Sequence, residues 1–119
     1  MSSDSGLGVG DHVWHSVGMR ATKDEMFRLH ANVCKGLADP KRLFLIDALR
    51  DGERTVSDLC EELDMPQTNA SQHLAVLRDK GLVRSRKDGQ WVYYSLTSPK
   101  IVVAVDLLRD VMAEQSAIA

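Results

Sequence analysis

A run of short polar side chains in the middle of the chain has the chemistry needed to contact a nucleic acid. It covers residues 66–73 and reads Pro66-Gln67-Thr68-Asn69-Ala70-Ser71-Gln72-His73. Hydroxyl and amide groups both donate and accept hydrogen bonds, as base edges and phosphates require. An exposed helix with a purely structural role would favour Ala, Glu, Lys and Arg instead. The alternative interpretation is an ordinary solvated helix face with polar capping residues.

Basic side chains follow this run. Between Gln67 and Gln90 there are five basic and two acidic residues, whereas the whole chain has 15 basic and 17 acidic residues and a formal charge of −2. A locally positive segment beside a polar helix is typical of phosphate contact. The alternative for basic residues on a strand is protection of a sheet edge against aggregation. The candidate DNA-contacting residues are Gln67, Thr68, Asn69, Ser71, Gln72, His73, Arg78, Arg84, Arg86 and Lys87.

Length and composition narrow the class of protein. A chain of 119 residues, 44% of them apolar, fits one folded domain and is too short for a Rossmann enzyme, a TIM barrel or a kinase. Its longest apolar run, residues 101–105, is far shorter than the roughly 20 residues of a membrane span. No basic stretch precedes an apolar segment at the N-terminus, so no export signal is expected and the predicted location is the cytoplasm.

Hydrophobic periodicity predicts the elements that position these side chains. A Gly- and Ser-rich flexible tail is expected over residues 1–20, followed by one domain over residues 21–115. Asp39 and Thr55 are expected to cap helices, and Gly52 to end one. Asp88-Gly89 between two β-rich runs predicts a hairpin. The predicted helices cover residues 23–37, 40–51, 55–63, 66–80 and 100–114, and the predicted strands cover residues 82–87 and 90–96.

This order predicts a mainly α fold with a β-hairpin wing, a winged helix-turn-helix of the form α-α-α-α-β-β-α. The turn at residues 62–65 separates a supporting helix from the candidate recognition helix. The last helix carries more apolar residues than one small domain can bury. A helix that is apolar around most of its circumference needs a partner, so a homodimer is expected.

Three segments resemble the ArsR/SmtB family of repressors over about residues 25–115. They are Gly36-Leu37-Ala38-Asp39-Pro40-Lys41-Arg42-Leu43, then Asn69-Ala70-Ser71-Gln72-His73-Leu74 with Leu77-Arg78-Asp79-Lys80-Gly81-Leu82-Val83, and Asp88-Gly89-Gln90-Trp91-Val92-Tyr93-Tyr94-Ser95-Leu96. The resemblance implies a homodimeric winged-helix repressor that binds double-stranded DNA at a palindromic operator. It further implies that the first and last helices form the dimer interface and that an inducer releases the DNA.

Two metal sites of the family lack their ligands here. By the resemblance, the Cys-x-Cys pair of a metalloid-sensing type falls on Thr55 and Ser57, which lack the soft thiolate such ions need. The zinc-sensing type has four ligands on the last helices, and the corresponding residues are Ser98, Lys100, Val111 and Glu114. Only the last of these is a metal ligand, so neither site is expected and no cofactor is predicted.

The two cysteines leave three alternatives open for sensing. Sulfur- and redox-sensing relatives have a cysteine pair on the second and last helices, but Cys34 and Cys60 fall on the first and third predicted helices. They are either buried hydrophobic residues or a thiol-based redox or sulfur sensor. Basic neighbours favour a thiolate at Cys34, and acidic neighbours disfavour one at Cys60. The third alternative is a metal or metalloid site of His30 and Cys34, completed by His12 and His15.

Two other classes of function compete with a DNA-binding repressor. A winged-helix module that binds protein would need a neutral or apolar recognition face, and the basic wing argues against it. An enzyme is not expected, because the sequence has no evident nucleophile-and-base set, carboxylate pair or Gly-rich phosphate loop. His73 and Ser71 are two residues apart on a helix and do not face each other.

Overall fold

The computed structural model describes residues 22–118, so the expected tail, with His12 and His15, lies outside the described residues. The backbone divides into two units, residues 1–32 and 33–119, and each is described by itself. Helix α2 (Lys23–Gly36) crosses the boundary between them. At its start, the Glu25 carboxylate accepts from the Thr22 amide, and the Thr22 hydroxyl accepts from the Glu25 amide. These reciprocal bonds form a capping box. The bonds that the Glu25 carboxylate accepts from the Thr22 amide and hydroxyl lower the pKa of Glu25.

The helix α3 (Pro40–Ala48) of the second unit precedes the helix-turn-helix. The Asp39 side chain accepts from the Lys41 amide at 2.7 Å, which confirms the expected cap and lowers the pKa of Asp39. The predicted helix over residues 40–51 is three residues too long, because α3 ends at Ala48. Short backbone bonds tighten the next turn, and Gly52 has a φ of +139°, a conformation that a side chain disfavours.

Helix α4 (Val56–Leu63) and helix α5 (Gln67–Asp79) form the helix-turn-helix. The Thr55 hydroxyl accepts from the Asp58 amide at 3.0 Å, as predicted. A left-handed residue, Asp64, ends α4 and starts the turn into α5. Gly81, with a φ of +78°, ends α5 as predicted, and the Leu82 amide bonds back to the Leu77 carbonyl.

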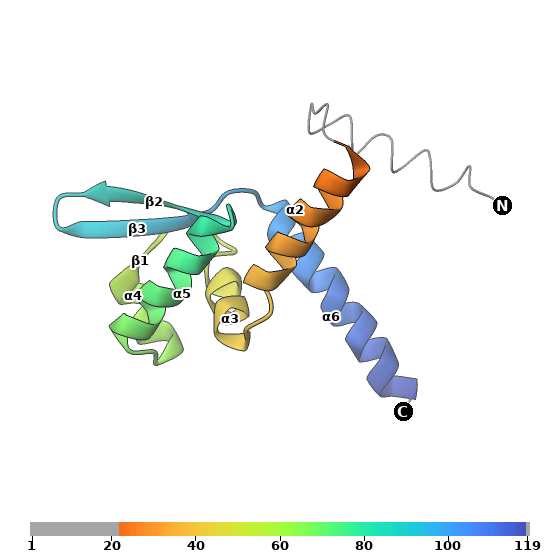
Figure 1. The fold of residues 1–119 in the computed structure, drawn as a ribbon. Coiled ribbons are helices and arrows are strands. Elements are labelled where there is room, and N and C mark those ends of the chain that lie inside the picture. The colour runs from red at the N-terminus through yellow and green to blue at the C-terminus, as the bar shows by residue number, and fades with distance from the viewer. Residues whose placement is uncertain (1–21, 119) are drawn as a thin grey trace. The chain divides into compact units, whose positions relative to one another are not determined.

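The predicted hairpin and one strand that was not predicted form a three-stranded sheet in the order β1-β3-β2. The hairpin strands are β2 (Val83–Asp88) and β3 (Trp91–Leu96), and β1 is only Arg54–Thr55. Asp88 pairs with Trp91, so the turn is Gly89-Gln90, one residue later than expected. Gly89 has a φ of +62° at the first turn position, where a type II′ turn places glycine. The hairpin extends above α4 and α5, away from the last helix (Figure 1).

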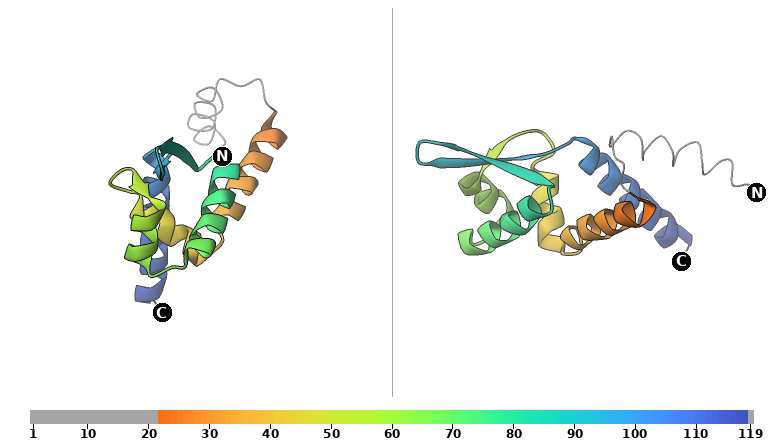
Figure 2. Two further views of the ribbon diagram at one scale, coloured as in Figure 1. Left: turned by 90° about the vertical axis from the view of Figure 1, so that its left-hand side faces the viewer. Right: turned by 45° about the horizontal axis from the view of Figure 1, so that its top comes forward.

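The core of the second unit lies between α3, α4, α5 and the base of the hairpin. Figure 2 shows the ribbons of these elements from two further sides. Leu59 of α4 and the triplet Ala70, Leu74 and Leu77 of α5 are fully buried. Val33 of α2 and Leu37, just after its end, pack against this core, whereas Leu29 of the same predicted stripe is 52% exposed. The other core residues are Leu45, Ile46, Leu49, Met65, Leu82, Val83 and Tyr94. A winged helix-turn-helix is therefore confirmed. No helix within residues 22–118 is long and apolar enough to cross a membrane.

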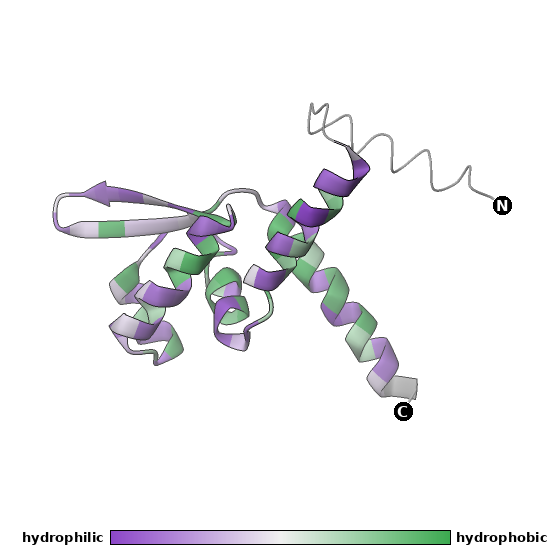
Figure 3. Ribbon diagram, in the orientation of Figure 1, coloured by the Kyte–Doolittle hydropathy of each residue, from purple (hydrophilic) through white to green (hydrophobic). Residues whose placement is uncertain are grey.

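Helix α6 (Lys100–Ile118) buries only part of its apolar surface. Val102 and Val105 are buried, whereas Leu107 and Leu108 are 59% and 60% exposed. Much of α6 is hydrophobic along its length (Figure 3). The prediction that this chain alone cannot bury the apolar surface of its last helix agrees with the structure. The exposed large apolar residues of α6 are Val103, Leu107, Leu108, Val111 and Met112.

Four alternating charges join the root of α6 to the end of α3. The Arg50 guanidinium donates to both carboxylate oxygens of Asp106, at 3.0 and 2.9 Å, and to Asp47 at 2.6 Å. Arg109 lies 3.4 Å from both aspartates. These hydrogen bonds with Arg50 lower the pKa of Asp47 and Asp106. The bidentate geometry of these exposed pairs orients α6 but contributes little to the free energy of unfolding. The cluster consists of Asp47, Arg50, Asp106 and Arg109.

We predict that the variant Asp106→Asn has a flatter acid profile of unfolding than the wild type. Because the folded pKa of Asp106 lies below its ordinary value of 3.8, its contribution is fully present above that value. The contribution is lost as the pH falls through the lowered folded value. Urea midpoints measured by circular dichroism from pH 7 to pH 2, at fixed protein concentration, check this. Asp110→Asn, on the same helix but outside the cluster, is the control. Parallel profiles for Asp106→Asn and wild type would contradict the prediction.

Candidate nucleic-acid interface

The polar residues predicted to contact DNA lie on the exposed side of α5. Gln67, Thr68, Ser71 and Gln72 are exposed, and Asn69 is half-buried at the edge of this face. The face is fixed because Ala70, Leu74 and Leu77 occupy the opposite side of the helix in the core. The N-cap residue Pro66 supplies no side-chain bond to the first turn. The first backbone amides of a helix lack partners within it and suit an anionic group such as phosphate.

The basic residues of the wing divide between the two faces of the hairpin. Successive side chains of a strand point to opposite faces, so Ser85 and Lys87 share one face of β2 and Arg84 and Arg86 the other. Arg78 of α5 donates to the Ser85 hydroxyl at 3.3 Å, which identifies the face that looks toward α5. Lys87 therefore continues the surface of the recognition helix onto the wing, whereas Arg84 and Arg86 lie on the far side.

Arg86 is engaged within the protein. Its guanidinium donates to both carboxylate oxygens of Glu53, at 3.0 and 2.8 Å, and lies 4.5 Å from the centre of the Tyr93 ring. The bonds with Glu53 raise the pKa of Arg86 and lower that of Glu53. Arg86 thus ties the wing to the segment before β1. The sequence counted it as a candidate DNA contact, because a charge count does not show partners.

His73 differs from the other polar residues of α5. It is half-buried, and its Nδ1 lies 3.2 Å from Nη1 of Arg42. The same guanidinium donates from Nε to the Gly36 carbonyl at 2.7 Å and from Nη2 to the Lys35 carbonyl at 3.3 Å. His73 is thus joined to the end of α2, while its neighbour Gln72 is exposed.

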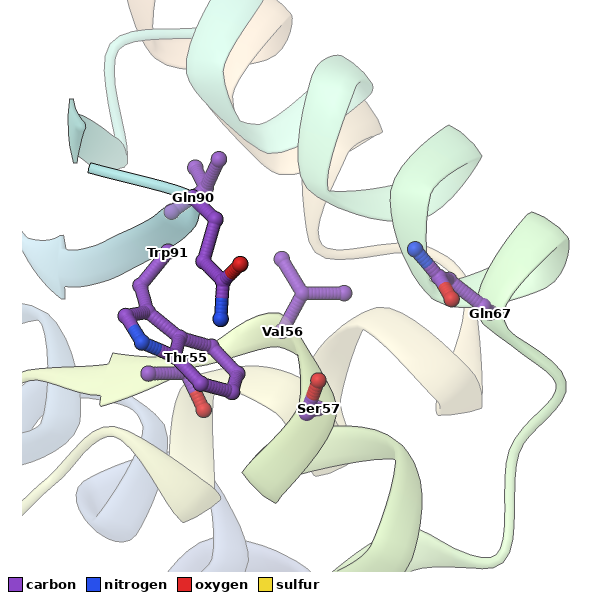
Figure 4. A pocket seen from close by; sticks show the side chains of 7 residues that line it. Thr55, Val56, Ser57, Gln67, Gln90 and Trp91 are labelled. Carbon is purple, nitrogen blue, oxygen red and sulfur yellow. The ribbon is translucent and has the colours of Figure 1, made fainter. Parts of the chain in front are cut away.

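A pocket of about 130 Å³ lies between the wing and the start of α5. Gln90 and Trp91 of the hairpin lie on one side and Gln67 on the other, with Val56 and Ser57 between them (Figure 4). Thr55 and Val92 complete the lining, which is neutral and provides amide and hydroxyl groups but no thiolate. Thr55 and Ser57, the positions of the metalloid ligands in the resemblance, therefore line a site without the chemistry for a soft ion.

The two cysteines have different surroundings. Cys34 on α2 is exposed, whereas Cys60 on α4 is half-buried and packs against the core. Both are free thiols. His30 and Cys34 lie four positions apart on α2. Within residues 22–118, no three His, Cys, Asp or Glu side chains are placed to hold a metal ion.

Arg42 and Trp91 are the site residues that sequence reasoning missed as individuals. Both stood in the quoted family segments, but no local pattern gave either of them a role. Arg42 contacts His73, which lies 31 residues further along the chain. Trp91 is 46% exposed and lines the same pocket as Gln67 at the start of α5, although the two residues are far apart in the sequence. A covariation signal between positions 42 and 73 in related sequences is the kind of signal that finds such pairs.

Comparison with known proteins identifies relatives of known role. Residues 39–85 match the family model described as "Bacterial regulatory protein, arsR family". The arsenical resistance operon repressor of Escherichia coli is 47% identical over 76 residues, which are 63% of this chain and 64% of the relative. The transcriptional activator HlyU of Vibrio cholerae is 40% identical over 74 residues, which are 62% of this chain and 68% of the relative.

A solved structure extends the similarity to the fold. The homodimeric winged helix-turn-helix DNA-binding domain of a possible ArsR-family regulator from Mycobacterium bovis superposes with a TM-score of 0.73. It is 30% identical in sequence, and the match covers 86% of this chain and 94% of that one. The relatives named here are regulators of transcription and not enzymes.

Proposed function

The chain belongs to the ArsR family of bacterial regulatory proteins, and on that premise we propose that it is a homodimeric repressor. It binds a palindromic operator in double-stranded DNA and leaves it when an inducer acts. One domain over residues 21–115 carries both the DNA face and the dimer helices. Regulation of bacterial transcription takes place in the cytoplasm, where a reducing environment keeps both thiols free.

The observation that carries this proposal is the continuity of one polar and basic surface from α5 to the wing. Gln67, Thr68, Ser71 and Gln72 present amides and hydroxyls to base edges from the exposed side of the recognition helix. Arg78, near the end of α5, and Lys87, on the side of the hairpin that faces α5, supply charge for phosphates. The neutral pocket lies between Gln67 and the wing. Its amide, hydroxyl and indole groups suit contact with the uncharged sugars of the DNA backbone.

We predict that Lys87→Ala weakens binding to all DNA sequences and lowers the slope of log affinity against log salt by about 1. Fluorescence anisotropy with the DNA upstream of its own gene, from about 50 to 200 mM salt, measures this slope. Arg84→Ala removes the same charge from the same strand on the opposite face and serves as the matched control. Equal slope changes in both variants would contradict the division of the wing into two faces.

The dimer interface that we propose consists of the first and last helices. The exposed apolar residues of α6 form one face, with Leu107, Leu108 and Val111 near its middle. On the described part of the first unit, Phe27 and Leu29 of α2 are 56% and 52% exposed. Apolar area of this extent on helices is typical of an interface between subunits.

We predict that Leu107→Glu raises the dimer dissociation constant roughly 100-fold, since an unpaired carboxylate buried in the interface costs about 3 kcal/mol. Ala113→Glu adds the same charge on the opposite side of α6 and is expected to leave the dimer intact. Sedimentation equilibrium of both variants measures the constants. A dimer that is unaffected by Leu107→Glu would place the interface elsewhere.

For the inducer, we propose thiol chemistry centred on Cys34, because its side chain is exposed whereas Cys60 packs on the core. We expect metal-free, reduced protein to bind the upstream DNA, and polysulfide or diamide to release it reversibly. Cys34→Ser should then bind without responding, and Cys60→Ser is its control.

Two other results of this anisotropy experiment decide between the alternatives. Tight binding that does not respond to oxidant contradicts thiol sensing. Release by added metal instead favours the site of His30 and Cys34 with tail histidines His12 and His15. If neither form prefers the upstream DNA to a scrambled sequence, the repressor proposal fails for that operator.

A further inference from the structure

The side chain of Arg42 joins the end of one helix to the middle of another. The last carbonyls of a helix have no partner within it, and those of Lys35 and Gly36 accept from the Arg42 guanidinium at the C-terminus of α2. A full positive charge is favourable at that end of a helix. The remaining Nη1 of Arg42 faces His73 of the recognition helix, 3.2 Å away.

The chemistry of this contact determines which nitrogen of His73 can accept a hydrogen bond from Arg42. A guanidinium has only donors, so Nδ1 of His73 must be the acceptor and carry no proton. A hydrogen bond between these two groups thus requires the ring proton on Nε2.

A second contact holds the recognition helix to the same place. Gly36 is buried, and a Cβ at this position would lie 3.0 Å from Cγ of Lys80 and 3.3 Å from Cδ1 of Leu82. The end of α2 therefore touches α5 in two places, at its middle through Arg42 and at its C-terminus through Gly36. The buried side of α5 fixes its rotation, and two contacts along its length fix its tilt against the end of α2, whereas one contact would leave a pivot.

We propose that Arg42 and His73 are a pair of positioning residues that sets the recognition helix on the end of α2. His73 then acts on DNA through this bond and not by reading a base, and the tilt that the bond gives α5 places Ser71 and Gln72. This inference rests on the proposed DNA-binding function. It assigns operator affinity to a contact made entirely inside the protein.

Two substitutions of His73 separate the positioning role from base reading. His73→Asn places a carboxamide oxygen at the position of Nδ1, so it still accepts from Arg42. His73→Gln places its polar atoms near Nε2, where a base-reading group would be needed. We expect His73→Asn to keep operator affinity within about threefold and His73→Gln to lose about tenfold. The salt slope should stay that of the wild type in both, because no phosphate contact is removed.

A double-mutant cycle tests whether the two residues act together. Arg42→Gln should lose about as much affinity as His73→Gln, and the double variant should lose no more than the worse single one. Arg42→Lys is the second variant at this position, because one ammonium keeps the charge but cannot reach both carbonyls and His73. Thermal unfolding by circular dichroism verifies that each variant is folded. The proposal is overturned if His73→Gln binds well and His73→Asn does not, if the losses add, or if all variants bind like the wild type.

The protonation of His73 provides a readout that does not depend on DNA. Nitrogen-15 spectra of the wild-type imidazole should show the proton on Nε2 and a hydrogen-bonded, unprotonated Nδ1. A proton on Nδ1 overturns the proposed pair whatever the DNA result. If the spectra agree but the wild type does not prefer its upstream DNA to a scrambled sequence, the repressor function fails and the bond between Arg42 and His73 stands.

Discussion

The burial of one side of α5 is the constraint on which the rest of the structure depends. Ala70, Leu74 and Leu77 have no exposed surface, and each buried leucine contributes roughly 1.5–3 kcal/mol. An exposed ion pair contributes roughly 0–1 kcal/mol, so apolar packing decides how α5 is rotated. Because a helix repeats every 3.6 residues, fixing that side also fixes the opposite side, where Gln67 and Ser71 are exposed. The direction of the side chains proposed to contact DNA is therefore set by buried leucines that make no contact with DNA.

Charge is divided between positioning and contact in a way that a local charge count cannot show. Arg86 pairs with Glu53 and lies over the Tyr93 ring, so its charge holds the wing to the segment before β1. Arg42 likewise caps α2 and meets His73. Lys87, whose neighbours on β2 alternate between the two faces, continues the surface that Arg78 and Ser85 begin. A bidentate arginine orients what it joins, whereas a lysine behaves as a point charge that suits phosphate of any sequence.

The elements that could be predicted from the sequence are those whose causes are local. Asp39 and Thr55 cap helices by bonding two or three residues onward, and the buried triplet of α5 follows from spacing alone. The features that were missed depend on distant partners. Strand β1 is two residues long and exists because β3 pairs with it. The hairpin turn moved by one residue because pairing of Asp88 with Trp91 set the register. Glu53 and Arg86 are 33 residues apart, and Arg42 and His73 are 31 apart, so no local pattern contains either pair.

The root of α6 explains how small energies can matter for the proposed function. Val102 and Val105 hold one side of α6 in the second unit, and the cluster of Asp47, Arg50, Asp106 and Arg109 adds geometry at the end of α3. If the exposed side of α6 joins two subunits, the direction of α6 sets where each α5 lies. Two recognition helices must be spaced about 34–36 Å apart to enter successive major grooves on one side of DNA. A small change in the direction of α6 at its root becomes a larger displacement of the distant recognition helix. An exposed cluster that contributes little to stability can therefore decide whether both recognition helices of the dimer contact their half-sites at once.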